Sequence, residues 1–188
     1  MLRIAGGSLR GRKLAGPRGL EFRPTTARIK EFVFFVYREK IPESRFLDLF
    51  AGTGSLGLEA LSRGAREGVF VERSARSLHI LGRNIDACGF NRQASVMNED
   101  VFAVLDRLGR KGETFDLVFA DPPFRESLRA RIAASVGTNR ILGRDGLLIL
   151  EHDMRDPDAD AGGLTLVRQK RFGDCVVSVY SPGGEEGS

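Results

Sequence analysis

The chain has 188 residues and a mass of 20.6 kDa, which suits one domain with a short appendage. Hydrophobic residues make up 41% and charged residues 29%, so the composition indicates a soluble, globular protein. No apolar run approaches the roughly 18 residues of a membrane-spanning helix, and the N-terminus lacks the apolar stretch of a secretory signal. Cys88 and Cys175 are far apart in the sequence, which indicates neither a zinc site nor a disulfide. We therefore expect a cytoplasmic protein.

Positive charge is concentrated at the N-terminus. The net charge is +4, yet residues 1–23 hold six basic side chains and one acid, whereas the other 165 residues hold 23 basic and 24 acidic ones. A basic arm on a near-neutral body is typical of an appendage that binds a polyanion. A solvated terminus would have the same composition, so charge alone leaves both interpretations open.

The predicted elements begin with a small hairpin in the arm, where short apolar segments alternate with glycines over residues 4–22. Apolar residues at helical spacing predict a helix that is capped at Thr25 or Thr26 and ends before Pro42. Strands are expected at 46–50, 68–72, 94–97, 115–120 and 147–151, and helices at 56–63, 74–88, 101–108 and 126–135. A loop at 156–163 then leads to two antiparallel strands at 164–170 and 175–180.

This alternation predicts a doubly wound α/β fold with a mostly parallel sheet and a C-terminal antiparallel hairpin. We expect an N-terminal extension at residues 1–24, a main domain at 25–182 and a disordered tail at 183–188. In such sheets the ligand binds outside the carboxyl ends of the strands. The residues that follow each predicted strand are therefore the candidates for function.

Three glycines follow the first strand and fit the G-x-G-x-x-G dinucleotide fingerprint: Gly52, Gly54 and Gly57. Glu72 lies twenty residues beyond the first of them, where an acid would bind a ribose, so a nicotinamide site must be considered. Asp48 argues against it, because a carboxylate before the turn would repel pyrophosphate and suits a cationic ligand. S-adenosylmethionine carries a sulfonium and an ammonium group and no phosphate. The sequence therefore favours S-adenosylmethionine over a dinucleotide or a purely structural turn.

Asp100 follows the third predicted strand and could accept a hydrogen bond from the adenine amino group, with Val101 packed on the ring. Aspartate is also a favoured helix cap, so a purely structural role is the alternative. The two roles are compatible with each other.

The fourth strand ends in Asp121-Pro122-Pro123-Phe124, the most specific signal in the chain. The prolines stiffen the turn and leave the carbonyls before them free. Asp121 and the Pro122 carbonyl would accept hydrogen bonds from both protons of an exocyclic base amine, and Phe124 would stack on the extruded base. This set predicts in-line methyl transfer to an amine nitrogen. The alternative is a strand that simply ends at two prolines.

These motifs resemble class I methyltransferases that act on amino nitrogens, and more narrowly the RsmD family, over Leu2 to Tyr180. R-P-T-T at residues 23–26 and the basic arm separate this family from DNA adenine methyltransferases. The other similar segments are 3–6, 11–14, Arg28, 47–65, 171–174 and Tyr180. One departure is Phe124, where the family usually has tyrosine; stacking survives this change, but a hydroxyl contact is lost.

The resemblance implies a Rossmann-like fold and methylation of the N2 amine of one guanine in 16S ribosomal RNA, within a small-subunit ribonucleoprotein particle. Neither a metal nor a membrane is expected, and we expect a monomer. The catalytic residues would be Asp121, Pro122 and Phe124. Those holding S-adenosylmethionine would be Thr26, Asp48, Phe50, Gly52, Thr53, Gly54, Glu72, Asp100 and Val101. RNA phosphates would be bound by Arg10, Arg12, Lys13 and Arg18.

Three other functions stay open. The Asp121 turn also suits adenine N6 in DNA, and a glutamine side-chain amide in a protein is a third acceptor. A non-catalytic RNA-binding assembly factor could keep the same fold. Against that last function stands the intact set of Asp48, Gly52, Gly54, Glu72 and Asp121, which a chain without catalysis has no physical reason to retain.

Overall fold

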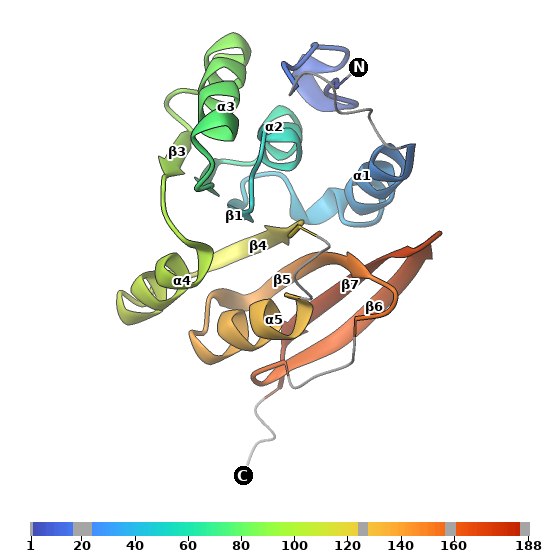
Figure 1. The fold of residues 1–188 in the computed structure, drawn as a ribbon, viewed down its shortest axis with the longest axis vertical. Helices are drawn as coiled ribbons and strands as arrows, with labels where there is room; N and C mark the ends of the chain where they lie inside the picture. The colour runs from blue at the N-terminus through green and yellow to red at the C-terminus, as the bar shows by residue number, and fades with distance from the viewer. Residues whose placement is uncertain (1, 17–23, 124–127, 157–160, 185–188) are drawn as a thin grey trace.

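A seven-stranded sheet in the order β3-β2-β1-β4-β5-β7-β6 forms the centre of the structure (Figure 1). The structure is a computed structural model, and it describes residues 2–16, 24–123, 128–156 and 161–184, without the side chains of residues 24–26. Strands β1 to β5 pair in parallel, whereas β7 runs antiparallel to both β5 and β6. The predicted α/β sheet with a C-terminal antiparallel hairpin is confirmed.

Most elements lie within a few residues of their predicted bounds. The strands are β1 (Arg45–Leu49), β2 (Glu67–Val71), β3 (Ala94–Met97), β4 (Phe115–Ala120), β5 (Leu142–Asp153), β6 (Leu164–Phe172) and β7 (Cys175–Pro182). The helices are α1 (Pro24–Val36), α2 (Ser55–Ser62), α3 (Ala75–Cys88), α4 (Val101–Arg110) and α5 (Arg129–Thr138), with 3₁₀ turns η1 (Gly7–Leu9) and η2 (Arg38–Lys40).

Three predicted bounds were wrong. Helix α1 starts at Pro24 itself, because proline lacks only a donor that the first helical position leaves unpaired anyway. Strand β5 starts at Leu142 instead of residue 147; the glycines and charged residues at 143–146 hid this part, where the pairing with β4 shifts register. Helix α5 occupies 129–138 instead of 126–135, with Ile132, Ala133 and Val136 on its buried side.

Side chains alternate between two cores along the strands. Leu117 and Phe119 of β4 join the core covered by α1, α2 and α3, which we call the α1 face. Val118 and Ala120 join the core beneath α4 and α5, which we call the α4 face. Burial on both faces explains the continuous apolar character of the parallel strands.

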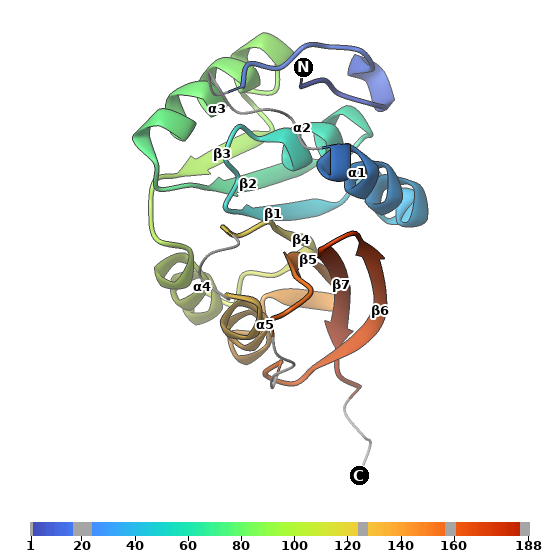
Figure 2. The same cartoon turned by 45° about the vertical axis from the view of Figure 1, so that its right-hand side comes forward.

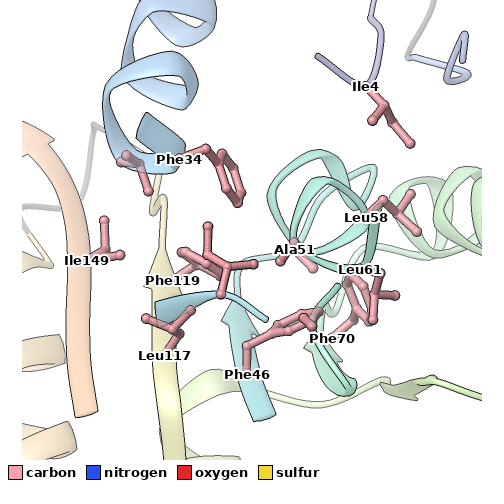
Figure 3. Close-up of a cluster of buried hydrophobic side chains, with 14 of the residues drawn as sticks. Ile4, Phe34, Phe46, Ala51, Leu58, Leu61, Phe70, Leu117, Phe119 and Ile149 are labelled. Carbon is pink, nitrogen blue, oxygen red and sulfur yellow. The ribbon is translucent and has the colours of Figure 1, made fainter. Parts of the chain in front are cut away.

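The described part of the arm, residues 2–16, is a short hairpin packed over α2 and α3 (Figure 2). Arg3 and Lys13 form an isolated antiparallel bridge, and the Leu14 amide donates to the Leu2 carbonyl at 3.0 Å. Ile4 is buried in the α1-face core with Leu58 (Figure 3). The predicted hairpin is therefore present, and apolar contacts anchor it to the body. Residues 17–23 lie outside the described ranges.

A buried carboxylate also fastens the arm. Glu59 of α2 is fully buried; it accepts a hydrogen bond from the Ala5 amide at 2.7 Å and pairs with Lys30 Nζ at 3.3 Å and Arg63 Nε at 2.9 Å. Burial lowers the pKa of Lys30, and the charge and hydrogen bond of Glu59 oppose that shift. One carboxylate thus joins the arm, α1 and α2.

Glu59→Ala should lower the free energy of unfolding by about 3 kcal/mol or more, because it leaves a buried lysine and the Ala5 amide without their acceptor. Urea unfolding measures this loss. The control is Glu67→Ala, which removes a half-exposed partner of Arg45 and should cost less than about 1 kcal/mol. Similar losses for the two variants would contradict the role given to Glu59.

Candidate functional site

A cleft of about 480 Å³ opens at the carboxyl ends of the parallel strands. Its lining comes from the segments that follow β1, β2, β3 and β4: Phe50, Val71, Glu72, Arg73, Ser74, Glu99, Asp100, Val101, Phe102, Asp121, Pro122, Pro123, Leu128 and Arg131. Six of the predicted site residues are among them. A wider hollow of about 1020 Å³ lies near Leu142, at the amino end of β5, and contains none of the predicted residues. The smaller cleft is therefore the candidate site, because it contains the predicted residues.

Phe50 reaches the cleft through an unusual backbone conformation. β1 ends at Leu49, one residue earlier than predicted, and Phe50 has φ 60°, in the left-handed region. That conformation costs a non-glycine residue of the order of 1 kcal/mol and is concentrated at functional sites. The sharp turn places the Phe50 side chain on the cleft wall, where it was predicted to contact the cofactor.

Glu72 is fixed by three backbone amides. Its Oε1 accepts hydrogen bonds from the Arg73 and Ser74 amides at 2.9 and 2.8 Å, and its Oε2 accepts one from the Gly52 amide at 2.8 Å. A carboxylate oxygen has two lone pairs, so Oε2 retains one for a further donor. The end of β2 is thereby tied to the glycine turn, and an oriented acceptor is held at the cleft, as binding a ribose hydroxyl requires.

Asp48 lies beneath the same turn and does not line the cleft. Its side chain is buried, and Oδ2 accepts a hydrogen bond from the Gly57 amide at 3.0 Å. Burial raises the pKa of Asp48 to about 7; the hydrogen bond from Gly57 opposes the shift, the Glu72 charge adds to it, and Lys30 opposes it. Direct contact of Asp48 with an ammonium group stays a prediction.

These two carboxylates distinguish the site from a dinucleotide site. A dinucleotide fingerprint offers loop amides and a helix N-terminus to pyrophosphate. Here the amides of Gly52 and Gly57 are already bound by Glu72 and Asp48. Gly57 serves packing, since a Cβ there would come within 2.3 Å of Phe70. The donor set fits a cationic ligand without phosphate, such as S-adenosylmethionine, and does not fit NAD.

Of the two roles that the sequence left open for Asp100, the structure shows the helix cap. Its Oδ1 accepts hydrogen bonds from the Phe102 and Ala103 amides at 3.0 and 3.4 Å and so caps α4. Its Oδ2 lies 3.7 Å from the Arg73 guanidinium, and both Asp100 and the buried Val101 line the cleft. The cap thus orients a carboxylate toward the cleft, and its contact with adenine stays a prediction.

The diproline turn closes one side of the cleft. Burial, together with the charges of Glu151 and Asp48, raises the pKa of Asp121 to about 8. The register pairs Ala120 of β4 with Leu150 of β5, so Asp121 lies beside Glu151, which remains within β5 opposite Val177 of β7. Sequence reasoning missed Glu151 as a site residue, although an acid at the end of an apolar run was a usable signal. Phe124 lies outside the described residues.

Asn84 was also missed, and it connects the arm to the glycine turn. Its Oδ1 accepts a hydrogen bond from the Ala15 amide at 2.7 Å, and its Nδ2 donates to the carbonyls of Ala15 at 3.0 Å and Thr53 at 2.9 Å. Asn84 is buried on the apolar stripe of α3, between Leu81 and Ile85. A polar residue on that stripe was the signal that could have revealed it.

The remaining predicted residues occupy different places. Arg10, Arg12 and Lys13 are exposed on the arm, away from the cleft lining. Gly52, Thr53 and Gly54 shape the turn without lining the cleft. Thr26 lies in α1 with its side chain undescribed, and Arg18 lies outside the described ranges. Within those ranges, no helix has the length and apolarity to cross a membrane, and no cluster of three metal-binding side chains occurs.

Comparisons with known proteins match nearly the whole chain. The family described as "Conserved hypothetical protein 95" matches residues 2–181. Ribosomal RNA small subunit methyltransferase D of Escherichia coli K12 is 34% identical, covering 95% of this chain and 89% of the relative. The protein of the same name from Haemophilus influenzae is 34% identical, covering 95% and 93%. The solved structure of the Escherichia coli protein yhhF has a TM-score of 0.84 and 32% identity, covering 98% and 99%.

Asn84→Ala should loosen the arm and the glycine turn together, because one amide side chain bonds to both. Hydrogen exchange should accelerate about tenfold in peptides covering residues 2–16 and 50–55, a change worth about 1.4 kcal/mol. Asn139→Ala, which removes an amide bonded to Asp106 and Ser135, is the matched control and should leave both segments unchanged. Acceleration in the arm alone would contradict the connection.

Asp121→Asn should stabilise the protein increasingly as the pH rises from about 4 to 8. The folded chain keeps the Asp121 proton up to a pKa of about 8, whereas the unfolded chain loses it near the ordinary aspartate pKa of 3.8, so the folded state loses stability across this window. Urea unfolding at pH 5, 7 and 8.5 tests this. The exposed substitution Asp86→Asn should keep the wild-type pH dependence. An unchanged pH dependence for Asp121→Asn would refute the assignment.

Proposed function

Because this chain belongs to the RsmD family, we propose that it transfers the methyl group of S-adenosylmethionine to the exocyclic N2 amine of a guanine in 16S ribosomal RNA. The names of the relatives support ribosomal RNA as the substrate. The observation that carries the proposal is the Asp121-Pro122 turn on the wall of the same cleft that contains Glu72. This arrangement puts amine acceptors next to a site suited to the methyl donor.

The cofactor side of the cleft would be held by residues from three strand ends. Glu72 would accept a hydrogen bond from a ribose hydroxyl through the free lone pair of Oε2, and Asp100 would accept one from the adenine amine, with Val101 against the ring. Asp48 beneath the turn would favour a positively charged ligand. When bound, S-adenosylmethionine supplies an electrophilic methyl group on a sulfonium.

On the substrate side, Asp121 and the Pro122 carbonyl would activate the amine. The N2 lone pair of guanine is delocalised into the ring; accepting hydrogen bonds from both N2 protons localises it toward the methyl group. The N–C bond forms as the S–C bond breaks, and the nitrogen loses one proton, which Asp121 can accept and pass to solvent. This step requires ionised Asp121; burial favours the protonated form, and the positive charge of a bound sulfonium donor would favour the ionised one.

Glu151 supports guanine over the adenine alternative. Guanine carries an N1–H donor beside its N2 amine, whereas adenine carries an N1 acceptor beside its N6 amine. A second carboxylate next to Asp121 suits two neighbouring donors and would repel the adenine N1 lone pair. The Cys175 thiol donates to Glu151 Oε1 at 3.1 Å and so helps to hold this carboxylate beside Asp121. This is the observation that favours guanine.

We further infer that residues 1–24 act as an RNA-binding extension of a monomeric catalytic domain at 25–182. Arg10, Arg12 and Lys13 are exposed on a hairpin that the body holds in place. A rigid basic hairpin suits a folded ribonucleoprotein particle, because its phosphates already have fixed positions. Phosphate contacts of this kind orient the RNA without reading its sequence.

Asp121→Ala should reduce methyl transfer at least 100-fold while binding of S-adenosylhomocysteine changes less than about threefold. Transfer is followed with S-adenosylmethionine and small ribosomal subunits from a strain that lacks the gene, and mass spectrometry of the digested RNA identifies the product. The control is the exposed substitution Asp86→Ala. N2-methylguanine is the expected product. N6-methyladenine would favour the DNA adenine alternative, and RNA binding without transfer would favour an assembly factor; either result contradicts the proposal.

A further inference from the structure

Strand β6 is the most exposed part of the sheet. Residues 165–171 are exposed without interruption, whereas residues 175–180 of the neighbouring β7 are buried. Over Leu164–Phe172 the strand carries Arg168, Lys170 and Arg171 and no acidic residue. Among the described residues, no ion pair involves any of these three. β6 therefore presents a net positive strip at the edge of the sheet.

Two of the three basic side chains lie on the α1 face. The register places Arg168 opposite Val179 and Lys170 opposite Val177, and both valines belong to the α1-face core. Residues directly opposite in an antiparallel pair share a face. Arg168 also lies beside the Tyr37 phenol, where its charge opposes the rise in the pKa of Tyr37 that burial causes. Arg171 serves the turn instead, donating to the Gly173 carbonyl at 2.7 Å.

The basic strip starts at the substrate side of the cleft. β6 runs parallel to β4 and β5, so its carboxyl end lies at the same edge of the sheet as Asp121. Phe172 at that end is opposite Cys175, whose thiol donates to Glu151. The ring of Phe172 is 5.5 Å from that of Phe32 in α1. The path from the diproline turn to Lys170 therefore crosses only β5 and β7.

The arm and β6 lie on opposite sides of α1 (Figures 1 and 2). On the exposed side of α1, Phe35 is 71% exposed, which is unusual for an aromatic residue and offers a surface on which an unpaired base can stack. Arg28 of the same helix is also exposed. Two basic surfaces thus flank a helix with an exposed ring, and the strand ends that carry Asp121 lie between them.

We propose that Arg168 and Lys170 form a second RNA-binding surface, which holds backbone phosphates on the other side of the target nucleotide from the arm. This inference rests on the proposed function. Extruding a base costs a few kcal/mol of stacking and pairing, and holding the backbone on both sides of it offsets that cost. The partner is RNA in which the target nucleotide lies between two segments of backbone. β6 binds one of these segments through charge, without reading bases.

The double variant Arg168→Gln/Lys170→Gln tests this surface. Its affinity for small ribosomal subunits from a strain that lacks the gene is measured between 50 and 300 mM KCl. Log K falls as log salt concentration rises, and the magnitude of this slope should decrease by about 1.4 to 1.8, as expected when two phosphate contacts are lost. Binding of S-adenosylhomocysteine should not change. The control, Arg110→Gln/Lys111→Gln at the end of α4, removes the same charge from an exposed site and should keep the slope.

A third variant, Arg10→Gln/Arg12→Gln/Lys13→Gln, separates the two surfaces. In a protein that carries both sets of substitutions, the two decreases in the magnitude of the slope should add, because the two sites share no partners. Equal slopes for the β6 variant and its α4 control would overturn the inference and show that β6 is charged only to prevent strand pairing. Wild-type protein that binds the RNA without methylating guanine would refute the proposed function alone. Wild-type protein that does not bind the small subunits would refute both.

Discussion

The carboxylate of Glu72 holds the site together, because it binds backbone amides from both sides of the cleft's cofactor end. It ties Gly52 to the segment after β2, while Asp48 binds the Gly57 amide from beneath. Both carboxylates accept hydrogen bonds from backbone amides of the glycine turn, which in a dinucleotide site a phosphate would accept. The glycine turn is therefore preformed around negative charge, which explains why the same glycine spacing suits a sulfonium donor.

Negative charge is concentrated on the α1 face of the sheet, at its carboxyl edge. Asp48 lies in β1, Asp121 follows β4 and Glu151 lies in β5. The charges of Glu151 and Asp48 add to burial in raising the pKa of Asp121, and the charge of Glu72 adds to burial in raising that of Asp48. Such a cluster opposes folding, because each carboxylate would be better solvated in the unfolded chain. A cation and a base edge rich in donors would relieve this repulsion. The site is thus strained without its ligands and complementary to them.

The sequence predicted the parts of the molecule that depend on local pattern. Short apolar runs predicted the strands, and the segments with helical spacing between them predicted the helices. Asp121 was found because it ends an apolar run and is followed by two prolines. The partners of Glu59 and Asn84 could not be found in this way, since they lie 54 and 69 residues away. The start of β5 was missed because Gly143 and Gly146 look like a loop, although Leu142 pairs with β4. Contacts between distant segments decided each of these cases.

Asn84 joins the arm to the glycine turn, and if the arm binds RNA as proposed, this joint has a thermodynamic consequence. Through Asn84, the same α3 side chain bonds to Ala15 of the arm and to Thr53 of the glycine turn. A ligand that orders one of these segments spares the other ligand part of its ordering cost. Linkage then requires reciprocity: whatever factor the donor adds to RNA affinity, RNA adds to donor affinity. The two ligands would therefore bind with positive heterotropic cooperativity, and the spent donor would leave more readily once the methylated RNA has departed.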